Sequence, residues 1–211
     1  MRDVAAIILA AGRSSRMGAF KPLLPFGDKT VIDSCIHNLR AAGVEEVVIV
    51  VGHRAEEVRS HLETAGVTFV TNPNPDSEMS VSIALGIAGL SANSRAVLIT
   101  PVDHPAVTPE IIRELIQAWR RGAKLIQPEF ESKGGHPVLV DLAFHDELTK
   151  LDETSGLRGF FVNHASEVLR LRVKSPFVAR DMDTWDDYAS LHQAVFGRKP
   201  EESERADEWS A

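Results

Sequence analysis

The 211-residue sequence contains a single cysteine, Cys35. One thiol can form neither an intrachain disulfide nor a thiolate metal cluster, so a reducing, cytoplasmic location is expected. No apolar run approaches the ~20 residues that a membrane-spanning helix needs, and the first residues lack the features of a signal peptide. The sequence therefore predicts neither a disulfide-rich secreted scaffold nor a membrane protein.

Positive charge is also scarce. The chain has 23 lysines and arginines against 30 acidic residues, which gives a formal net charge of -7 at pH 7. Proteins that coat nucleic acids usually carry a basic face, so no nucleic-acid partner is expected. The hydrophobic content of 44% and the charged content of 25% are typical of a globular protein.

This composition predicts one domain over residues 1–197. The remaining segment, residues 198–211, holds mostly charged and polar side chains and is predicted to be a disordered, acidic tail.

Apolar runs alternate with segments of helical length and period, which predicts an α/β fold with a mostly parallel central sheet covered by helices on both faces. Strands are expected at Val4–Leu9, Glu46–Val51, Val67–Val70, Ala96–Thr100, Lys124–Gln127, Pro137–Val140 and Val168–Val173. Helices are expected at Thr30–Ala42, Glu56–Ala65, Met79–Leu90, Pro109–Arg120, Leu142–Leu151 and Ser155–His164, with a last one beginning near Thr184 and a loop at Glu129–Gly135.

The first predicted strand leads into a turn rich in glycine and serine that carries Arg13, Arg16 and Lys21. No acidic residue occurs between Asp3 and Asp28. Small residues let backbone N–H groups approach phosphate oxygens, and the cations add attraction, so this loop is predicted to bind an anion. The alternative is an ordinary connection with solvated arginines. The spacing fits neither a P-loop nor a dinucleotide-binding fingerprint.

Two acidic segments are candidates for a metal site. Asp103 follows a predicted buried strand, where ligands of α/β sheets usually bind. Thr108 is a better N-cap for the next helix than Asp103 is. The Asp103 carboxylate is therefore expected to be free to bind Mg²⁺. Asp181 and Asp183 alternate in a second segment, where Thr184 and Asp187 form a capping pair. The alternatives are that Asp103 caps the next helix and that the second cluster is merely solvated.

The run Leu9 to Leu24 reads LAAGxSxRMGxxKPLL, which resembles the signature of nucleotidyltransferases with a Rossmann-like fold. Among these it is most similar to the molybdenum cofactor cytidylyltransferases. The resemblance implies a three-layer Rossmann-like nucleotidyltransferase fold and Mg²⁺-dependent transfer of CMP from CTP to the phosphate of molybdopterin, with release of pyrophosphate. The Leu-Ala-Ala-Gly form favours CTP, because guanylyl members usually carry Leu-Ala-Gly-Gly.

The resemblance also implies roles for individual residues. Arg16, Lys21 and Asp103 would be catalytic, Asp103 and Asp183 would hold the metal, and Gly135, His136, Pro137 and Arg158 would bind the acceptor. The nucleotide would contact Leu9, Ala10, Ala11, Gly12, Arg13, Arg16, Lys21, Asn72, Ser80, Ser82 and Asp103. The alternative for Ser80 and Ser82 is that they cap the helix that begins there.

The chain departs from the family pattern at several positions. His104 stands where these cytidylyltransferases usually have Gln, Glu78 replaces a glycine, and the segment 154–158 lacks the aspartate of the family's Gly-Asp-x-Gly-Ala-Arg motif. Three alternatives therefore stay open. They are a GTP-using guanylyltransferase, a nucleotidyltransferase for sugar phosphates or other small molecules, and a non-catalytic nucleotide-binding partner of a molybdoenzyme.

Overall fold

The computed structural model describes residues 3–201 and contains one eight-stranded sheet. Its strands are β1 (Val4–Ala10), β4 (Glu46–Val51), β5 (Thr68–Thr71), β6 (Ala96–Pro101), β7 (Leu125–Phe130), β8 (Lys133–Gly134), β9 (Val138–Asp141) and β10 (Val168–Arg172). The strand order is β10-β7-β9-β6-β1-β4-β5, and β8 pairs with β7. The pairs β4–β5, β1–β4, β1–β6 and β7–β10 are parallel, whereas β9 is antiparallel to both of its neighbours. The predicted mostly parallel sheet is confirmed.

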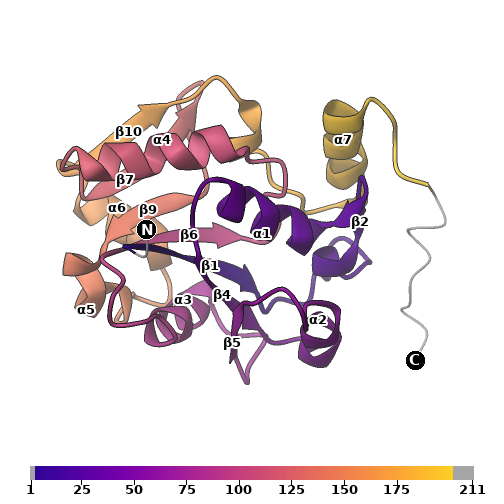
Figure 1. Cartoon of the computed structure of the whole chain (residues 1–211), viewed down its shortest axis with the longest axis horizontal. Helices are drawn as coiled ribbons and strands as arrows, with labels where there is room; N and C mark the ends of the chain where they lie inside the picture. Colours follow the sequence, from indigo (N-terminus) through magenta and orange to yellow (C-terminus); the bar gives the residue numbers. More distant parts are fainter. Residues whose placement is uncertain (1–2, 202–211) are drawn as a thin grey trace.

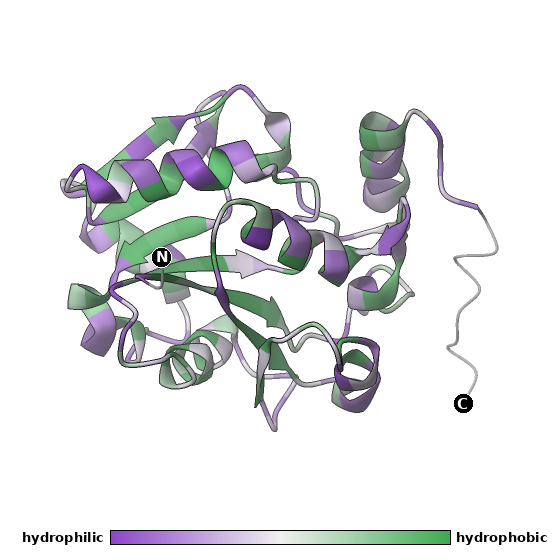
Figure 2. Cartoon of the chain, in the orientation of Figure 1, coloured by the Kyte–Doolittle hydropathy of each residue, from purple (hydrophilic) through white to green (hydrophobic). Residues whose placement is uncertain are grey.

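Strand β1 lies in the interior of this sheet, between β6 and β4, and all of its side chains are apolar. Each of its seven residues is buried, and so are the last five residues of β4. A strand that is covered on both faces reads as a continuous apolar run. Figure 2 shows these central strands as the most hydrophobic part of the chain.

Helices cover both faces of the sheet (Figure 1). One face packs against α1 (Val31–Ala41), α2 (Ala55–His61) and α4 (Pro109–Arg120), and α7 (Trp185–Phe196) adds side chains to the same apolar core. The other face packs against α3 (Met79–Ala88), α5 (His145–Leu148) and α6 (Gly156–Asn163). This arrangement is the three-layer Rossmann-like architecture that the sequence predicts. Among the helices of residues 3–201, none is long and apolar enough to cross a membrane.

Two local predictions are wrong. The segment 129–135 is not a loop, because β7 continues to Phe130 and turns into the antiparallel strand β8. The segment 142–151 is not one helix, because a 3-10 turn, η2 (Leu142–Phe144), precedes a four-residue α5. The Asp141 side chain accepts a hydrogen bond from the backbone N–H of Ala143, which favours a tight turn at this point.

Several short elements were not predicted. They are η1 (Lys21–Leu23), the hairpin strands β2 (Pro25–Phe26) and β3 (Lys29–Thr30), and η3 (Pro176–Ala179). The predicted acidic tail lies mostly outside the described residues; within them, the Arg198 carbonyl accepts a hydrogen bond from His192 Nδ1 at 2.7 Å.

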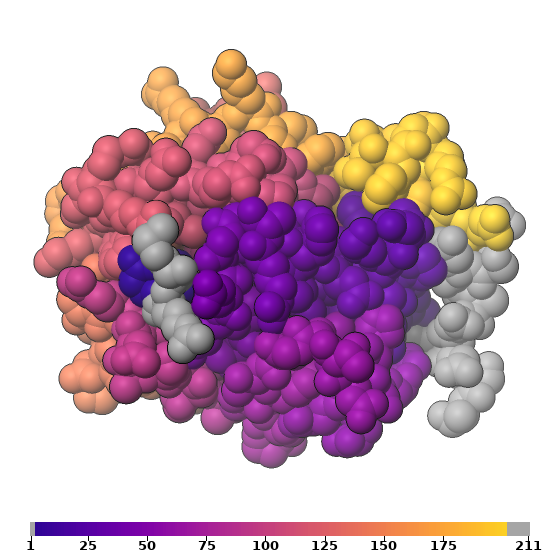
Figure 3. All heavy atoms as spheres, viewed as in Figure 1, coloured from indigo at the N-terminus to yellow at the C-terminus, as the bar shows by residue number. Residues whose placement is uncertain are grey.

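Helix α7 packs against the β2–β3 hairpin, although about 160 residues separate them in the sequence (Figure 3). Tyr188 Oη donates a hydrogen bond to the Pro25 carbonyl at 2.5 Å, and the rings of Phe26 and Phe196 meet edge to face at 4.9 Å. Because α7 begins just after Asp183, this packing holds the Asp183 segment beside the N-terminal part of the chain.

The start of α7 is fixed by a capping box. Thr184 Oγ1 accepts from the Asp187 backbone N–H, and the Asp187 carboxylate accepts from the Thr184 N–H at 2.8 Å. Asp187→Ala should therefore lower the free energy of unfolding by about 0.5–2 kcal/mol in a urea titration. Asp186→Ala is the matched control, since it removes a charge from the same helical turn without removing the cap. Equal losses in the two variants would contradict a specific role of the box.

Candidate active site

The loop after β1 lies at the carboxyl end of the sheet, beside the end of β6. Ser14 adopts a φ of 55°, and its hydroxyl accepts a hydrogen bond from the Lys21 backbone N–H at 3.3 Å. Met17, in the middle of the loop, is 3% exposed and anchors the loop in the core. A Cβ atom added at Gly12 would meet no atom within 4 Å, so this side of the loop faces open space. The backbone at Gly12 is therefore accessible to a ligand.

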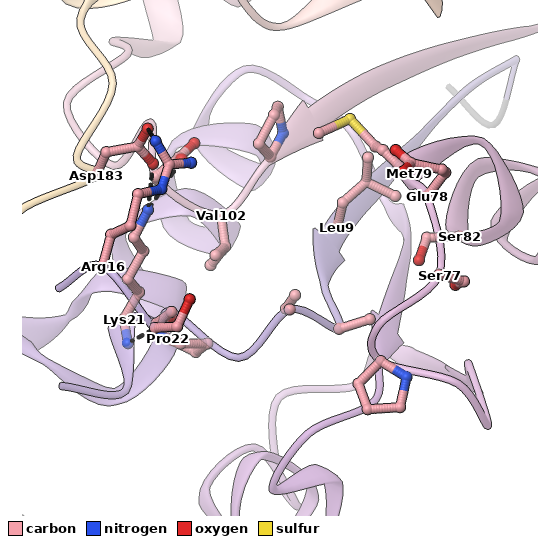
Figure 4. Close-up of a pocket in the computed structure, with 18 residues that line it drawn as sticks. Leu9, Arg16, Lys21, Pro22, Ser77, Glu78, Met79, Ser82, Val102 and Asp183 are labelled. Carbon is pink, nitrogen blue, oxygen red and sulfur yellow. Dashed lines mark hydrogen bonds and ion pairs between the residues drawn. The ribbon is translucent and has the colours of Figure 1, made fainter. Parts of the chain in front are cut away.

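The three cations of the loop all face carboxylates from distant parts of the chain. Arg13 pairs with Asp76 at 2.6 Å. Arg16 Nη1 lies 2.9 Å from Asp183 Oδ2. Lys21 Nζ lies 2.9 Å from Asp183 Oδ1 and 3.4 Å from Asp103 Oδ2. Arg16, Lys21 and Asp183 gather at one side of a pocket, across from Ser77, Ser82 and Met79 (Figure 4).

This first pocket contains most of the predicted nucleotide-binding residues. Leu9, Ala10, Ala11, Gly12, Arg16, Lys21, Ser82, Asp103 and Asp183 line it. The predicted residues Arg13, Asn72 and Ser80 do not line it. Pro75, Ser77, Glu78 and Met79 also line the pocket, and sequence reasoning singled out none of them as a ligand contact.

Asn72 lies behind the pocket wall and orients Ser82. The Asn72 side-chain amide donates hydrogen bonds to Ser82 Oγ and to Ser77 Oγ, both at 2.9 Å. Each serine hydroxyl then has its own proton free to donate toward the pocket. Ser80 differs from Ser82, because it lines a second pocket and its hydroxyl has no hydrogen-bond partner among the described residues.

The second pocket adjoins the first and shares Glu78 and Met79 with it. Of the four predicted acceptor-binding residues, His136 and Arg158 line this pocket. Gly135 and Pro137 do not, and a Cβ at Gly135 would lie 1.9 Å from the Val178 carbonyl oxygen. Close packing of the chain against η3 therefore explains this glycine.

Two further polar residues of the second pocket lie on neighbouring strands. They are Gln127 of β7 and Arg170 of β10, and the Arg170 guanidinium donates a hydrogen bond to the side-chain amide oxygen of Gln127. A Cβ at Gly134 would lie within 3 Å of both side chains, so this glycine leaves room for the pair. The sequence gives little indication that these two residues line a pocket, because each lies within a strand and belongs to no recognisable motif.

Asp103 is not spare, contrary to the sequence-based interpretation. Its Oδ1 accepts a hydrogen bond from His104 Nδ1 at 2.9 Å, and its Oδ2 faces Lys21. Burial alone would raise the pKa of Asp103, but the His104 hydrogen bond and the Lys21 ammonium outweigh it and lower the pKa to about 2. Thr108 occupies the N-cap position of α4, as predicted, although its side chain makes no capping hydrogen bond.

His104 joins two carboxylates of the site. Besides its hydrogen bond to Asp103, its Nε2 lies 3.4 Å from Asp181 Oδ1. Burial would lower the pKa of His104, but these two carboxylates raise it to about 9. Next to it, burial and the charge of His104 lower the pKa of His136 to about 4, so His136 is neutral at pH 7. Asp181 thus faces an imidazolium, while Asp183 faces Lys21 and Arg16.

The donor set of the first pocket fits a hard divalent cation. Its charged lining residues are the cations Arg16 and Lys21 and the carboxylates Glu78, Asp103 and Asp183. This excess of carboxylates would repel a triphosphate unless a divalent cation entered with it. Among residues 3–201 no group of three or more His, Cys, Asp or Glu could hold a metal. Mg²⁺ is commonly held by only one or two carboxylates together with substrate phosphates, as Asp103 and Asp183 would allow.

Cys35 takes no part in this site. It is buried on α1, its thiol donates to the Val102 carbonyl at 3.5 Å, and burial raises its pKa. A protonated thiol in the core is a poor nucleophile. This agrees with a reaction that uses no side-chain nucleophile.

The fold and the site together define a nucleotide-binding α/β enzyme of the nucleotidyltransferase class. The chain belongs to the family of the MobA-like NTP transferase domain, whose model matches residues 6–168. It is 26% identical over 196 residues to the molybdenum cofactor cytidylyltransferase of Escherichia coli K12, covering 92% of this chain and 97% of that protein.

Two solved structures of a protein from Mycobacterium tuberculosis H37Rv are also similar. The crystal structure of Rv0371c matches with a TM-score of 0.80 and 27% identity, over 91% of this chain and 98% of the other. A complex of Rv0371c with manganese matches with a TM-score of 0.78 and 25% identity, with the same coverage.

Proposed function

We propose that this nucleotidyltransferase transfers CMP from CTP to the phosphate of molybdopterin, releases pyrophosphate and requires Mg²⁺. The observation that carries the proposal is the pair of adjoining pockets, one lined by Arg16 and Lys21 and the other by Arg158 and Arg170. They share Glu78 and Met79 at their boundary. A donor nucleotide in the first pocket and an acceptor phosphate at this boundary would bring the reacting groups together. Catalysis of this kind rests on positioning and charge stabilisation.

Each charged residue of the first pocket has a role in this proposal. Arg16 and Lys21 bind the triphosphate and neutralise the charge that develops on the leaving pyrophosphate. Asp103 and Asp183 would hold Mg²⁺, which would supply positive charge to the reacting phosphates when bound. The Gly12 backbone leaves room for the phosphates to approach the loop.

The Leu-Ala-Ala-Gly form and the cytidylyltransferase relative from E. coli support the choice of CTP. The Ala11 methyl lies against Gly52, because a Cβ added at Gly52 would lie 3.0 Å from it. We assign base selection to the pocket wall across from Arg16 and Lys21, where the hydroxyls of Ser77 and Ser82 accept from Asn72 and keep their own protons to donate. Hydrogen bonds to a polar base edge discriminate more strongly than a methyl contact does.

The test is a screen of CTP, GTP, ATP and UTP with Mg²⁺ and molybdopterin, in which pyrophosphate release is measured. We expect the highest kcat/KM with CTP and no release without the acceptor. A preference for GTP would refute the cytidine assignment. Turnover with a sugar phosphate but not with molybdopterin would refute the acceptor. Binding of CTP without any release of pyrophosphate would instead indicate a carrier for a molybdoenzyme.

A further inference from the structure

His104 is the most deeply buried of the ionisable side chains in the ion pairs around Asp103. Its side chain is 2% exposed, compared with 17% for Asp103 and 67% for Asp181. Its ring packs edge to face against the His136 ring, with 5.2 Å between their centroids. Burying an imidazole costs free energy unless its polar atoms are paired, so its hydrogen bond to Asp103 has to offset part of that cost.

The hydrogen bond from His104 determines how the Asp103 carboxylate is oriented. Nδ1 holds Oδ1 at 2.9 Å, which leaves Oδ2 facing the Lys21 ammonium, and this ammonium also bonds to Asp183. Lys21 alone would orient the carboxylate weakly, because its ammonium lies 3.4 Å from Oδ2 and bonds more closely to Asp183. The His104 ring in turn has little freedom to move, because it is enclosed by the core and by His136.

We propose that His104 is a positioning residue that fixes the orientation of Asp103, so that one carboxylate oxygen faces the nucleotide pocket ready to bind the metal. This inference rests on the proposed function, since it takes Asp103 to be a metal ligand. Residues that hydrogen-bond to a metal-binding side chain and so fix its orientation typically contribute 10- to 100-fold to metal affinity or activity. His104 lines neither the first nor the second pocket, so the proposal gives it no direct contact with the substrate.

Asp181 is the competing partner of His104. It is mostly exposed, and its carboxylate lies 3.4 Å from Nε2, farther than Asp103 lies from Nδ1. Nε2 makes no hydrogen bond among the described residues, and water screens the exposed Asp181 carboxylate, so this contact holds the ring less firmly than the hydrogen bond to Asp103 does. The proposal therefore assigns the effect of His104 to Asp103.

Two amide variants separate these partners. The side-chain nitrogen of asparagine lies at the same bond separation from Cβ as Nδ1, whereas that of glutamine corresponds to Nε2. His104→Asn can thus retain the hydrogen bond to Asp103, and His104→Gln can retain the contact with Asp181. His104→Leu keeps a comparable volume and removes both, and Asp181→Asn neutralises the competing carboxylate.

The measurement is Mn²⁺ affinity by electron paramagnetic resonance, with inorganic tripolyphosphate as the second ligand so that no base or acceptor is needed. Melting temperatures are recorded for every variant. We expect His104→Leu to lose about 10-fold or more in Mn²⁺ affinity. His104→Asn and Asp181→Asn should stay within about 3-fold of the wild type, and His104→Gln should resemble the leucine variant.

The outcomes are distinct. Wild-type affinity in His104→Leu would overturn the inference. If His104→Gln retained Mn²⁺ affinity and His104→Asn lost it, the role would belong to Asp181 and the assignment to Asp103 would be wrong. Should His104→Leu not fold, the comparison of the two amide variants still decides. If the wild-type protein bound no Mn²⁺, the proposed metal site itself would be wrong. This outcome is recognised from the wild type alone, before any variant is measured.

Discussion

Replacing Asp103 with asparagine is expected to lower kcat about 10²-fold or more, the scale of losing one strong electrostatic stabiliser. Asparagine keeps the shape of the side chain but removes the negative charge that attracts Mg²⁺. The loss should persist at saturating Mg²⁺, because the remaining ligand Asp183 also faces Arg16 and Lys21. Pyrophosphate release at several Mg²⁺ concentrations measures this effect.

The same substitution should also reduce stability. Asp103 accepts from the buried His104 and faces Lys21, and asparagine offers only one acceptor oxygen to these two donors. Hydrogen bonds to charged groups contribute about 1.5–3 kcal/mol each, so a lower melting temperature is expected. Turnover must therefore be measured well below the melting temperature of the variant.

Asp181→Asn is the matched control for Asp103→Asn. Asp181 belongs to the same carboxylate cluster, but it is 67% exposed and does not line the nucleotide pocket. It should keep turnover within about 3-fold of the wild type. Near wild-type turnover in Asp103→Asn, or an equal loss in Asp181→Asn, would show that the pocket carboxylate is not the metal ligand.

The sequence predicts long, periodic elements well, since their patterns depend only on local residues. The expected bounds of the strand Glu46–Val51 and the helix Pro109–Arg120 match β4 and α4. The β2–β3 hairpin was missed because its two-residue strands carry no periodicity and are held by α7, far along the chain. Strand β8 was missed for the same reason, because it exists only by pairing with β7.

Four of the five charged residues of the first pocket, Arg16, Lys21, Asp103 and Asp183, were predicted and Glu78 was missed. The structure brings these residues together across large sequence distances. Lys21 and Asp183 are 162 residues apart and lie 2.9 Å from each other. What the sequence could not show is how they are paired. The loop was expected to present free cations to an anion, yet the folded chain pairs Arg13, Arg16 and Lys21 with carboxylates. Their roles in binding a nucleotide stay predictions.

Lys21→Met should weaken the binding of CTP roughly 10- to 100-fold while leaving cytidine binding nearly unchanged. Its side chain is 11% exposed, and its ammonium lies between Asp103 and Asp183, at the end of the pocket that we propose binds the phosphates. A charge-assisted hydrogen bond of about 1.5–3 kcal/mol accounts for a change of this size. Isothermal titration with CTP and with cytidine measures the two affinities, and added salt should weaken wild-type binding of CTP more than that of the variant.

The melting temperature in the presence of Mg²⁺ provides a second test of Lys21→Met, in which the effect of the ligand is expected to increase and not to decrease. Without Lys21, Asp103 and Asp183 lose the ammonium that lies between them, so the free protein should become less stable. Mg²⁺ can then occupy the space near the two carboxylates, and it should raise the melting temperature of Lys21→Met more than that of the wild type. Lys29→Met is the matched control, because Lys29 pairs with Asp28 outside the pocket. If cytidine and CTP lost affinity equally in Lys21→Met, or if Mg²⁺ stabilised all three proteins alike, Lys21 would not belong to the triphosphate and metal site.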